Sequence, residues 1–487
     1  MASPKIDPTL KNAAPGASDG GSLYAETVMI HPRTVKGTFR TWKWAAMALL
    51  LAVYHLGPFL RWDRGPGAPN QAILADMTGR RGYFFFLEIW PQEVYYITGL
   101  LFIAAIALFF MSSLAGRVWC GFFCFQTVYT DLFMLVERLV VGDRSKRMAL
   151  DRAPWSAAKF GKKAVINLVW LAISASCGIG FTLFFGNAPS MLVDILTGNE
   201  DVGVYSAIAV VGGCCFLLAG YAREQVCLYM CPYSRFQSAM FDEHSLIVGY
   251  EEWRGEPRKP ARKGEGFENR GHCIDCKMCV TACPTGIDIR DGIQMGCIGC
   301  ALCIDACNSM MDRYKLPRGL ITWDSIANQA ARAEGRQGKL RLVRSRTIIY
   351  AVIMSLVGGL IVFSLASRKT TELNVIHERS PLYVQMSDGA IRNGYVLKVL
   401  NMVREDRTFI LEVGGIDGAR VSVVGGESNV AAATLKVSPD AIGAYNVFVN
   451  APLASLQGKR TPLVFTLRET SEGGITRVES LFAAPDK

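Results

Sequence analysis

The sequence is poor in charge, in histidine and in nucleotide-binding motifs. Asp, Glu, Lys and Arg make up only 19% of its 487 residues. That is too few for an ordinary soluble protein with 51% hydrophobic residues and a mean hydropathy of +0.23. Of the five histidines only His55 lies in a long apolar run, so a membrane haem held by two histidines lacks a ligand pair. No glycine-rich dinucleotide fingerprint or P-loop is present, which argues against nicotinamide, flavin and nucleotide sites. We expect no nucleic-acid partner.

The two ends of the sequence lack other features. Residues 1 to about 35 are polar, with no apolar core after a basic start, so we expect a mobile cytoplasmic tail rather than a signal peptide. No cysteine follows Cys307, so the C-terminal region has no disulfide to stabilise it.

What the sequence has instead is long uncharged runs. Each is about 17 to 22 residues, enough to cross a hydrocarbon layer of about 30 Å as a helix. We predict five spans: Trp44–Leu60, Val94–Ala115, Val165–Gly186, Gly203–Ala222 and Thr347–Ala366.

The charges of the connecting loops predict the orientation. Arg117–Lys163 carries nine Lys or Arg, whereas Asn187–Val202 carries none and has three acidic residues. By the positive-inside rule the N-terminus and residues 251–346 lie in the cytoplasm, and the C-terminal tail lies outside. Four arginines between the first two predicted spans run mildly against this rule.

Eight of the fifteen cysteines form two runs of C-x2-C-x2-C-x3-C, the pattern of bacterial two-cluster ferredoxins. Three thiolates of one run bind a [4Fe–4S] cluster, and the fourth ligand comes from the other run. We therefore assign Cys273, Cys276, Cys279 and Cys307 to one cluster, and Cys297, Cys300, Cys303 and Cys283 to the second. Structural zinc is the alternative, but two tight cysteine triplets suit it poorly. Disulfides within such triplets would be strained.

A second cysteine pattern follows the second and fourth predicted spans. Cys120 and Cys124 form one C-x3-C motif, and Cys227 and Cys231 form another, which suggests an internal duplication. If each motif is helical, its two sulfurs lie on one face, and the four thiols converge at the membrane surface. Soft thiolates select Cu(I), zinc or iron–sulfur clusters, and thiols beside basic residues are also reactive. The alternative is plain packing, which we also expect for the remaining three: Cys177, Cys214 and Cys215.

The C-terminal tail alternates apolar and polar residues, as in Tyr395–Val399 and Phe409–Val413, with turn signals such as Ser438-Pro439-Asp440 between the runs. About seven short strands predict an antiparallel, immunoglobulin-like sandwich. It shows no catalytic constellation, so we expect a binding or docking module.

The predicted fold is thus a membrane α-helical protein with about five spans, a cytoplasmic two-cluster ferredoxin-like domain and a C-terminal all-β sandwich. The predicted boundaries are 1–43 for the tail, 44–250 for four spans, 251–346 for the ferredoxin domain with a basic stem, 347–366 for the fifth span, and 367–487 for a periplasmic sandwich.

The chain resembles the CcoG/FixG/RdxA family of membrane polyferredoxins, which mature cbb-type oxidases. The resemblance rests on these motifs, together with the eight cluster cysteines and the tail: Leu23-Tyr24-Ala25, Ile30-His31-Pro32-Arg33, Gly37-x-Phe39-Arg40-x-x-Lys43-Trp44, Trp90-Pro91-Gln92, Trp119-Cys120-Gly121-x-x-Cys124-x-Gln126-Thr127-Val128 and Cys227-x-x-x-Cys231-Pro232. One departure is Phe125, where the family usually has proline; we expect it to alter either the local turn or the tuning of the site, while both thiols remain.

The resemblance implies a cupric reductase of the bacterial inner membrane. It would pass electrons from two [4Fe–4S] clusters to Cu(II), with the C-x3-C thiols binding copper, and supply Cu(I) to the oxidase. The expected partners are the membrane, copper ions, oxidase assembly factors or copper chaperones, an unidentified electron donor and another copy of the chain in a homo-oligomer. Two alternatives stay open: a quinol-oxidising electron donor similar to NapH and NosR, and a non-catalytic copper carrier or scaffold.

Overall fold

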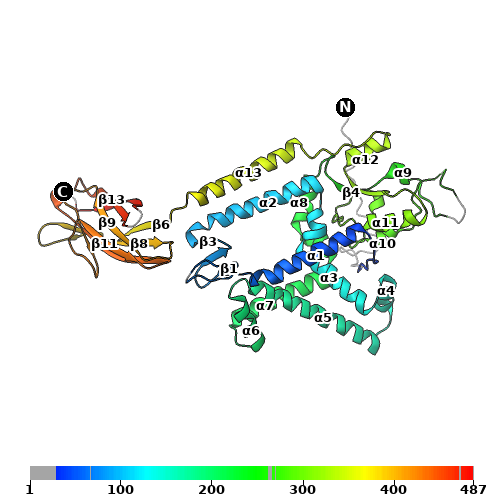
Figure 1. Cartoon of the computed structure of the whole chain (residues 1–487), viewed down its shortest axis with the longest axis horizontal. Helices are drawn as coiled ribbons and strands as arrows, with labels where there is room; N and C mark the ends of the chain where they lie inside the picture. Colours follow the sequence, from blue (N-terminus) through cyan, green and yellow to red (C-terminus); the bar gives the residue numbers. More distant parts are fainter. Residues whose placement is uncertain (1–28, 66, 262–265, 269, 471–472, 486–487) are drawn as a thin grey trace, which may run out of the picture. The chain divides into compact units, whose positions relative to one another are not determined.

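A computed structural model describes residues 29–65, 67–261, 266–268, 270–470 and 473–485. The chain divides into two compact units (Figure 1). Unit 1 comprises Met1–Trp62 with Asn70–Gly358, and unit 2 comprises Asp63–Pro69 with Gly359–Lys487. Residues 1–28, which include the motif Leu23-Tyr24-Ala25, lie outside the described residues.

Four helical stretches in the described part of the chain are long and apolar enough to cross a membrane: Pro91–Ala115, Ala157–Thr182, Val202–Ala222 and Ser345–Ala366. They contain helices α2 (Tyr95–Ala115), α5 (Ala157–Thr182), α7 (Val202–Cys215) with the π-helical turn η4 (Phe216–Ala222), and α13 (Ser345–Ala366). Most of their apolar side chains are not covered by protein; in α13 the most apolar window is entirely unburied. Such extensive exposed apolar surface is that of a membrane protein.

The first predicted span is also helical, as α1 (Thr38–Leu56). It is not among the four, and its first turns carry Arg40 and Lys43, both buried against other protein groups. The count of five spans and the orientation in the membrane therefore stay predictions.

Short elements connect these helices in unit 1. Between α1 and α2 lies a small antiparallel sheet that the sequence analysis did not predict, with strands β1 (Ile73–Asp76), β2 (Arg81–Phe84) and β3 (Leu87–Ile89). The other short elements of this region are η1 (Gly57–Phe59), η2 (Pro91–Glu93), η3 (Trp119–Phe123), α3 (Phe125–Val140), α4 (Arg144–Arg152), α6 (Ala188–Thr197), η5 (Val226–Met230) and α8 (Pro232–Met240).

The cysteine-rich domain is built from short helices closed by one pair of strands. Its elements are β4 (Ile247–Tyr250), α9 (Glu252–Gly255), α10 (Met278–Ala282), η6 (Ile289–Asp291), α11 (Leu302–Arg313), β5 (Ile321–Asp324) and α12 (Ile326–Ala333). Strand β4 pairs antiparallel with β5, with Ile247 opposite Asp324, so the strands hold the two ends of the domain together. Apolar side chains of both strands and of α11 form its core.

The N-terminal segment departs from the sequence analysis. The backbone N–H of Arg33 donates to the carbonyl of Thr281 (2.7 Å), and Thr34 donates to Asp143 (3.0 Å). A Cβ on Gly37 would lie 2.3 Å from Cγ of Asp305, so the segment lies directly against α11. The prediction of a mobile tail over residues 1 to about 35 is therefore wrong at Arg33 and Thr34.

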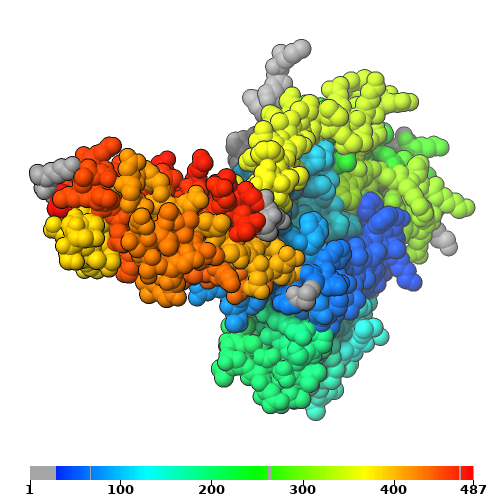
Figure 2. Space-filling view, turned by 60° about the vertical axis from the view of Figure 1, so that its left-hand side comes forward, coloured from blue at the N-terminus to red at the C-terminus, as the bar shows by residue number. Residues whose placement is uncertain are grey.

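We call residues 29–43 the N-terminal strap. In Figure 2 the blue residues at the start of the described chain lie against the yellow-green residues of the cysteine-rich domain. The strap also joins this domain to α3, because the backbone N–H of Arg40 donates to Asp305 (2.8 Å) while its guanidinium pairs with Asp131 (2.9 Å).

Unit 2 is a sandwich of two antiparallel sheets. In its described residues one sheet has the strand order β10-β12-β8-β6, with β7 also paired to β8, and the other has the order β11-β9-β13-β14. The strands are β6 (Thr371–His377), β7 (Val384–Gln385), β8 (Ile391–Asn401), β9 (Arg407–Gly414), β10 (Arg420–Val423), β11 (Ala432–Val437), β12 (Ala441–Ala451), β13 (Arg460–Glu469) and β14 (Ile475–Ala483), with the short helix η7 (Leu453–Ser455).

The apolar positions that predicted the sandwich form its core. Tyr395, Leu397 and Val399 of β8 and Phe409 and Leu411 of β9 are completely buried. The prediction of a C-terminal β-sandwich is confirmed, although the sequence analysis did not identify β14 or the two-residue strand β7, both of whose residues are exposed.

Candidate iron–sulfur and thiol sites

The two cysteine runs of the C-x2-C-x2-C pattern fold into the same local backbone. In the first run, Asp275 and Lys277 on either side of Cys276 have φ of 50° and 54°. In the second run, Gly299 and Ala301 on either side of Cys300 have φ of 67° and 57°. Left-handed conformations are uncommon for residues other than glycine, and they gather at functional sites. Turns of this kind direct backbone N–H groups inward and make cavities that hold anions and iron–sulfur clusters.

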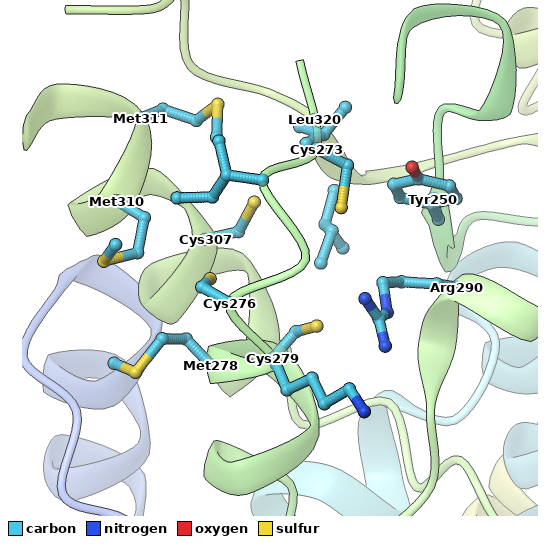
Figure 3. A pocket seen from close by; sticks show the side chains of 13 residues that line it. Tyr250, Cys273, Cys276, Met278, Cys279, Arg290, Cys307, Met310, Met311 and Leu320 are labelled. Carbon is cyan, nitrogen blue, oxygen red and sulfur yellow. The ribbon is translucent and has the colours of Figure 1, made fainter. Parts of the chain in front are cut away.

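The first pocket lies inside the first of these turns. Its lining includes Cys273, Cys276, Cys279 and Cys307, together with Tyr250 and apolar side chains of α11 and β5, around about 350 Å³ of space free of protein atoms. Figure 3 shows the four cysteines surrounding this space, with Cys273 on one side and Cys307 on the facing helix. These are the four residues that the sequence predicts as ligands of one cluster.

Electrostatics confirms that Cys307 lies close to the other three thiols. Burial, together with the neighbouring thiols of Cys279, Cys276 and Cys273, raises the pKa of Cys307 to about 12. Cys307 therefore lies beside the first cysteine triplet, although it is 28 positions further along the chain than Cys279.

The second pocket adjoins the first and has nearly the same size, about 340 Å³ of space free of protein atoms. Cys283, Cys297, Cys300 and Cys303 line it, and Cys279 is shared with the first pocket. Burial raises the pKa of Cys303 well above its ordinary value, with further increases from the other cysteines of this pocket. The structure thus brings together the second predicted set, including the exchanged ligand Cys283.

The donor set of each pocket fits a [4Fe–4S] cluster. Four thiols, inward-facing backbone amides and apolar walls are the surroundings such clusters have in proteins. Among the described residues no three His, Cys, Asp or Glu side chains converge closely enough for a single metal ion. In a [4Fe–4S] cluster each cysteine binds a different iron atom, so the four cysteine sulfurs lie farther apart than the ligands of a single metal ion. Such a group takes up and releases one electron at a time.

Each pocket has one buried arginine beside it, which the sequence analysis did not identify. Arg290 lines the first pocket and donates to Asp275 and Asp288. Arg117 donates to the carbonyl oxygens of Met295 and Cys297 next to the second pocket.

The two C-x3-C motifs also share one backbone shape. Each forms a π-helical turn, η3 and η5, in which the N–H of the second cysteine donates to a carbonyl five residues back: Cys124 to Trp119 (2.9 Å) and Cys231 to Val226 (2.8 Å). The residues that precede the two turns match as well, since Gly116 (φ 62°, ψ −128°) corresponds to Arg223 (φ 41°, ψ −114°). Both motifs are helical, as π-helical rather than α-helical turns, and the predicted duplication agrees with this repeated backbone.

Phe125 does not change this turn. It is the first residue of α3, as Pro232 is of α8, and both preceding cysteines are extended. Proline is favoured at the first helical position because the N–H there needs no helical partner and the fixed φ of proline suits a helix, but other residues adopt the same conformation. Of the two effects expected from Phe125, a change of the local turn is not seen.

The four C-x3-C thiols lie within electrostatic reach of one another. Burial is the main cause that raises the pKa of Cys120 to about 12; Cys124, Cys227 and Cys231 contribute to the rise, and Arg117 opposes it. The pKa of Cys227 is raised to about 11, again mainly by burial. The thiol of Cys120 also donates to Gln237 Oε1 (3.1 Å). We call these four cysteines the thiol site.

The thiol site packs directly on the loop of the second pocket. A Cβ on Gly121 would lie 2.9 Å from Cα of Cys300, so the two backbones touch. Cys120 and Cys227 pack against the buried side chains around Cys300. Arg117 also donates to the carbonyl of Ser234 in α8, so it connects the loop of the second pocket with the helix that follows Cys231. The second pocket is therefore in contact with the thiol site.

Three family models match the chain: "4Fe-4S binding domain" at residues 97–144, "4Fe-4S dicluster domain" at 222–326, and "IG-like fold at C-terminal of FixG, putative oxidoreductase" at 361–485. Nitrogen fixation protein FixG of Rhizobium meliloti is 41% identical, over 89% of this chain and 88% of that protein. Protein RdxA of Cereibacter sphaeroides is 43% identical, over 94% and 98%. A crystal structure of a FixG-related protein from Vibrio parahaemolyticus is 25% identical over 24% of this chain and 97% of that chain, with a TM-score of 0.20.

Apolar helices, two cysteine-lined pockets and these matches together define an iron–sulfur electron-transfer protein of the membrane. The chain belongs to the family of FixG, RdxA and RdxB.

Proposed function

We propose that this protein reduces Cu(II) to Cu(I) at the thiol site, with electrons delivered through the second pocket. The observation that carries the proposal is the contact of Gly121 with Cys300. Cys120 and Cys227 therefore lie beside the cysteines predicted to bind the second cluster. Each Cu(II) takes one electron, and the Cu(I) formed is the softer ion. Thiolate sulfur prefers the softer ion, so a site of four thiols favours the reduced product over the substrate.

Protons accompany this chemistry. Because burial raises the pKa of Cys120 to about 12 and that of Cys227 to about 11, these thiols are protonated at neutral pH before a metal binds. Copper displaces their protons, and Arg117 offsets the negative charge that remains on the thiolates. The proposal therefore gives Arg117 a stabilising role at both the second pocket and the thiol site.

The family resemblance extends the proposal to the cell. We propose that the Cu(I) goes to the copper centre of a cbb-type oxidase, through assembly factors or copper chaperones. The protein would lie in the bacterial inner membrane, with the ferredoxin domain in the cytoplasm and the sandwich in the periplasm.

One observation favours a different role for the same thiols. The family model described as a 4Fe-4S binding domain covers residues 97–144 and so includes Cys120 and Cys124. In this second candidate function the four thiols hold an additional iron–sulfur cluster, and the protein passes electrons onward, for example from a quinol, without reducing copper.

Iron content and copper reduction, measured on the same preparations, test these proposals. The variants are Cys120→Ser/Cys124→Ser and Cys227→Ser/Cys231→Ser, and the control is Cys214→Ser, an exposed cysteine in α7. We expect about eight iron atoms per chain in all of them, from two clusters of four. Both double variants should lose Cu(II) reduction, and the control should keep it. Iron that falls together with activity supports the additional cluster, and unchanged turnover in both double variants overturns a role for these thiols in copper reduction.

A further inference from the structure

A second pair of buried thiols lies between α5 and α7, apart from the thiol site. Cys177 is completely buried, and Cys215 is nearly so. The two helices meet there at backbone contact distance: a Cβ on Gly178 would lie 2.5 Å from the carbonyl oxygen of Ile208, and one on Gly212 would lie 2.8 Å from that of Ser174. Small residues at such a crossing allow this approach. The crossing places Cys177 and Cys215 within hydrogen-bonding reach of each other.

Three hydroxyl groups surround this pair. Tyr54 Oη donates to the carbonyl of Cys177 (2.8 Å) and lies 4.0 Å from its sulfur. The hydroxyl groups of Tyr129 and Ser174 are buried. Each lies within hydrogen-bonding reach of a thiol, Tyr129 of Cys177 and Ser174 of Cys215. A thiol sulfur is only a weak acceptor, whereas a buried hydroxyl group needs a good one.

Plain packing explains the two cysteines but not the hydroxyl groups. A small apolar core needs no hydroxyl groups, and alanine or valine would fill the same space. Thiolates, in contrast, accept hydrogen bonds from hydroxyl groups, and those bonds spread the negative charge that a buried thiolate carries. The arrangement therefore suits the deprotonated state of the pair, which a bound metal ion maintains.

We propose that Cys177 and Cys215 form a two-coordinate Cu(I) site, with hydrogen bonds to its sulfurs from Tyr129 and Ser174. Cu(I) is soft and is stable between two sulfurs in a line, whereas zinc requires four ligands. Binding breaks two S–H bonds, forms two Cu–S bonds and releases two protons, with no change in oxidation state.

Tyr129 connects this pair with the thiol site. It lies on α3, which begins directly after Cys124, and its ring lies 4.5 Å from that of Phe125. The ring of Phe125 also contacts Tyr54 (6.1 Å). The proposed site at Cys177 and Cys215 rests on the proposed function in one respect, since it would take the Cu(I) that the thiol site produces.

The test supplies copper already reduced, so that it does not depend on Cu(II) reduction. Full-length anaerobic protein is titrated with Cu(I) from a coloured chelator complex, and the bound copper and its sulfur coordination are measured by chelator competition and X-ray absorption. The variants are Cys177→Ser/Cys215→Ser, each single alanine variant and Tyr129→Phe, with Cys214→Ser as the matched neighbour.

We expect the double variant to bind one Cu(I) fewer than the wild type, with iron per chain and Cu(II) reduction in a single turnover unchanged. Each single alanine variant should lose the same site, so that misfolding of the double variant does not decide the result. Tyr129→Phe should keep the stoichiometry and bind this Cu(I) about tenfold more weakly, as expected for one lost hydrogen bond to a charged sulfur. Cys214→Ser should match the wild type.

An unchanged Cu(I) stoichiometry in the variants overturns the proposal, as does finding the two cysteines joined as a disulfide that does not respond to Cu(I). If the wild type fails to reduce Cu(II) but still loses one Cu(I) on mutation, the proposed function fails and this site stands.

Discussion

Arg117 should control the reduction potential of the second cluster. Its side chain is only 4% exposed and forms no ion pair with a carboxylate in the described residues. It donates instead to three backbone carbonyl groups, of Met295, Cys297 and Ser234. An unpaired buried charge is strongly unfavourable unless another charge nearby compensates it. An anionic cluster bound to Cys297 provides that charge, and it gains another negative charge on reduction.

The magnitude follows from Coulomb's law. A unit charge about 7 Å from the cluster, at an effective dielectric constant of about 20, stabilises the added electron by roughly 2.4 kcal/mol. Since 59 mV corresponds to about 1.4 kcal/mol for one electron, Arg117→Gln should lower the potential of the second cluster by on the order of 100 mV. The first cluster lies on the far side of the shared Cys279 and should move much less.

The assay is an anaerobic redox titration followed by electron paramagnetic resonance, which resolves the two clusters. Arg117→Lys is the control for charge, because it keeps the cation and loses the forked hydrogen bonds. Arg290→Gln is the mirror control, which should shift the first cluster instead. Equal shifts of both clusters in Arg117→Gln, or the same shift in Arg117→Lys and Arg117→Gln, would refute the assignment of the effect to the charge of Arg117.

Three further predictions test the cluster ligands, the strap and the topology. Cys307→Ser should remove the cluster held by the first cysteine triplet, and iron analysis with spectroscopy should find the second cluster intact; loss of the second signal would contradict the exchange of ligands. Asp131→Asn should lower the free energy of unfolding near neutral pH by about 3–5 kcal/mol, because it leaves buried cations unpaired. Burial raises the pKa of Asp131, but Lys43 and Arg40 lower it more, so the net shift is downward. The carboxylate therefore stabilises the fold above its ordinary pKa near 3.9, and this stabilisation is lost as pH falls through the lower folded-state pKa. Denaturation in detergent should show the difference at pH 7, whereas the exposed control Asp312→Asn should leave stability unchanged, and equal stability of both variants would contradict the prediction. A reporter active only outside the cytoplasm should work when fused after Leu467 and fail near Lys315; activity at both positions would contradict the orientation.

Local spacing made the cluster cysteines predictable. Each triplet extends over seven residues, so the turn that holds it depends on its own sequence and little on the rest of the chain. The exchange of Cys283 and Cys307 also follows from the spacing, because the pattern itself encodes which run supplies the fourth thiol. The sandwich was predictable for a similar reason, since the alternation in β8 and β9 records which face is buried.

Contacts over long sequence distances were not predictable in this way. Arg117 and the carbonyl of Met295 are 178 positions apart, and nothing in the local sequence of either indicates the partner. The N-terminal strap is polar, as a mobile tail would be, but its polar groups bind Asp131 and Asp305 in other segments. The closeness of Cys177 and Cys215 was likewise not predictable, because they lie on separate helices and their apolar sequence surroundings name no partner.

The two C-x3-C repeats have kept their thiols and diverged in charge. When the turns are aligned on Cys120 and Cys227, Arg117 of the first repeat corresponds to Glu224 of the second. Arg117 faces the loop of the second pocket, where a cation favours an added electron. Glu224 is buried near Cys227, and burial raises the pKa of its carboxyl group. Under the proposed function, the first repeat faces the source of electrons, and Glu224 of the second repeat lies beside a thiol that would bind copper. The duplication accounts for the repeated pair of thiols, and the exchanged charge makes the surroundings of the two pairs different.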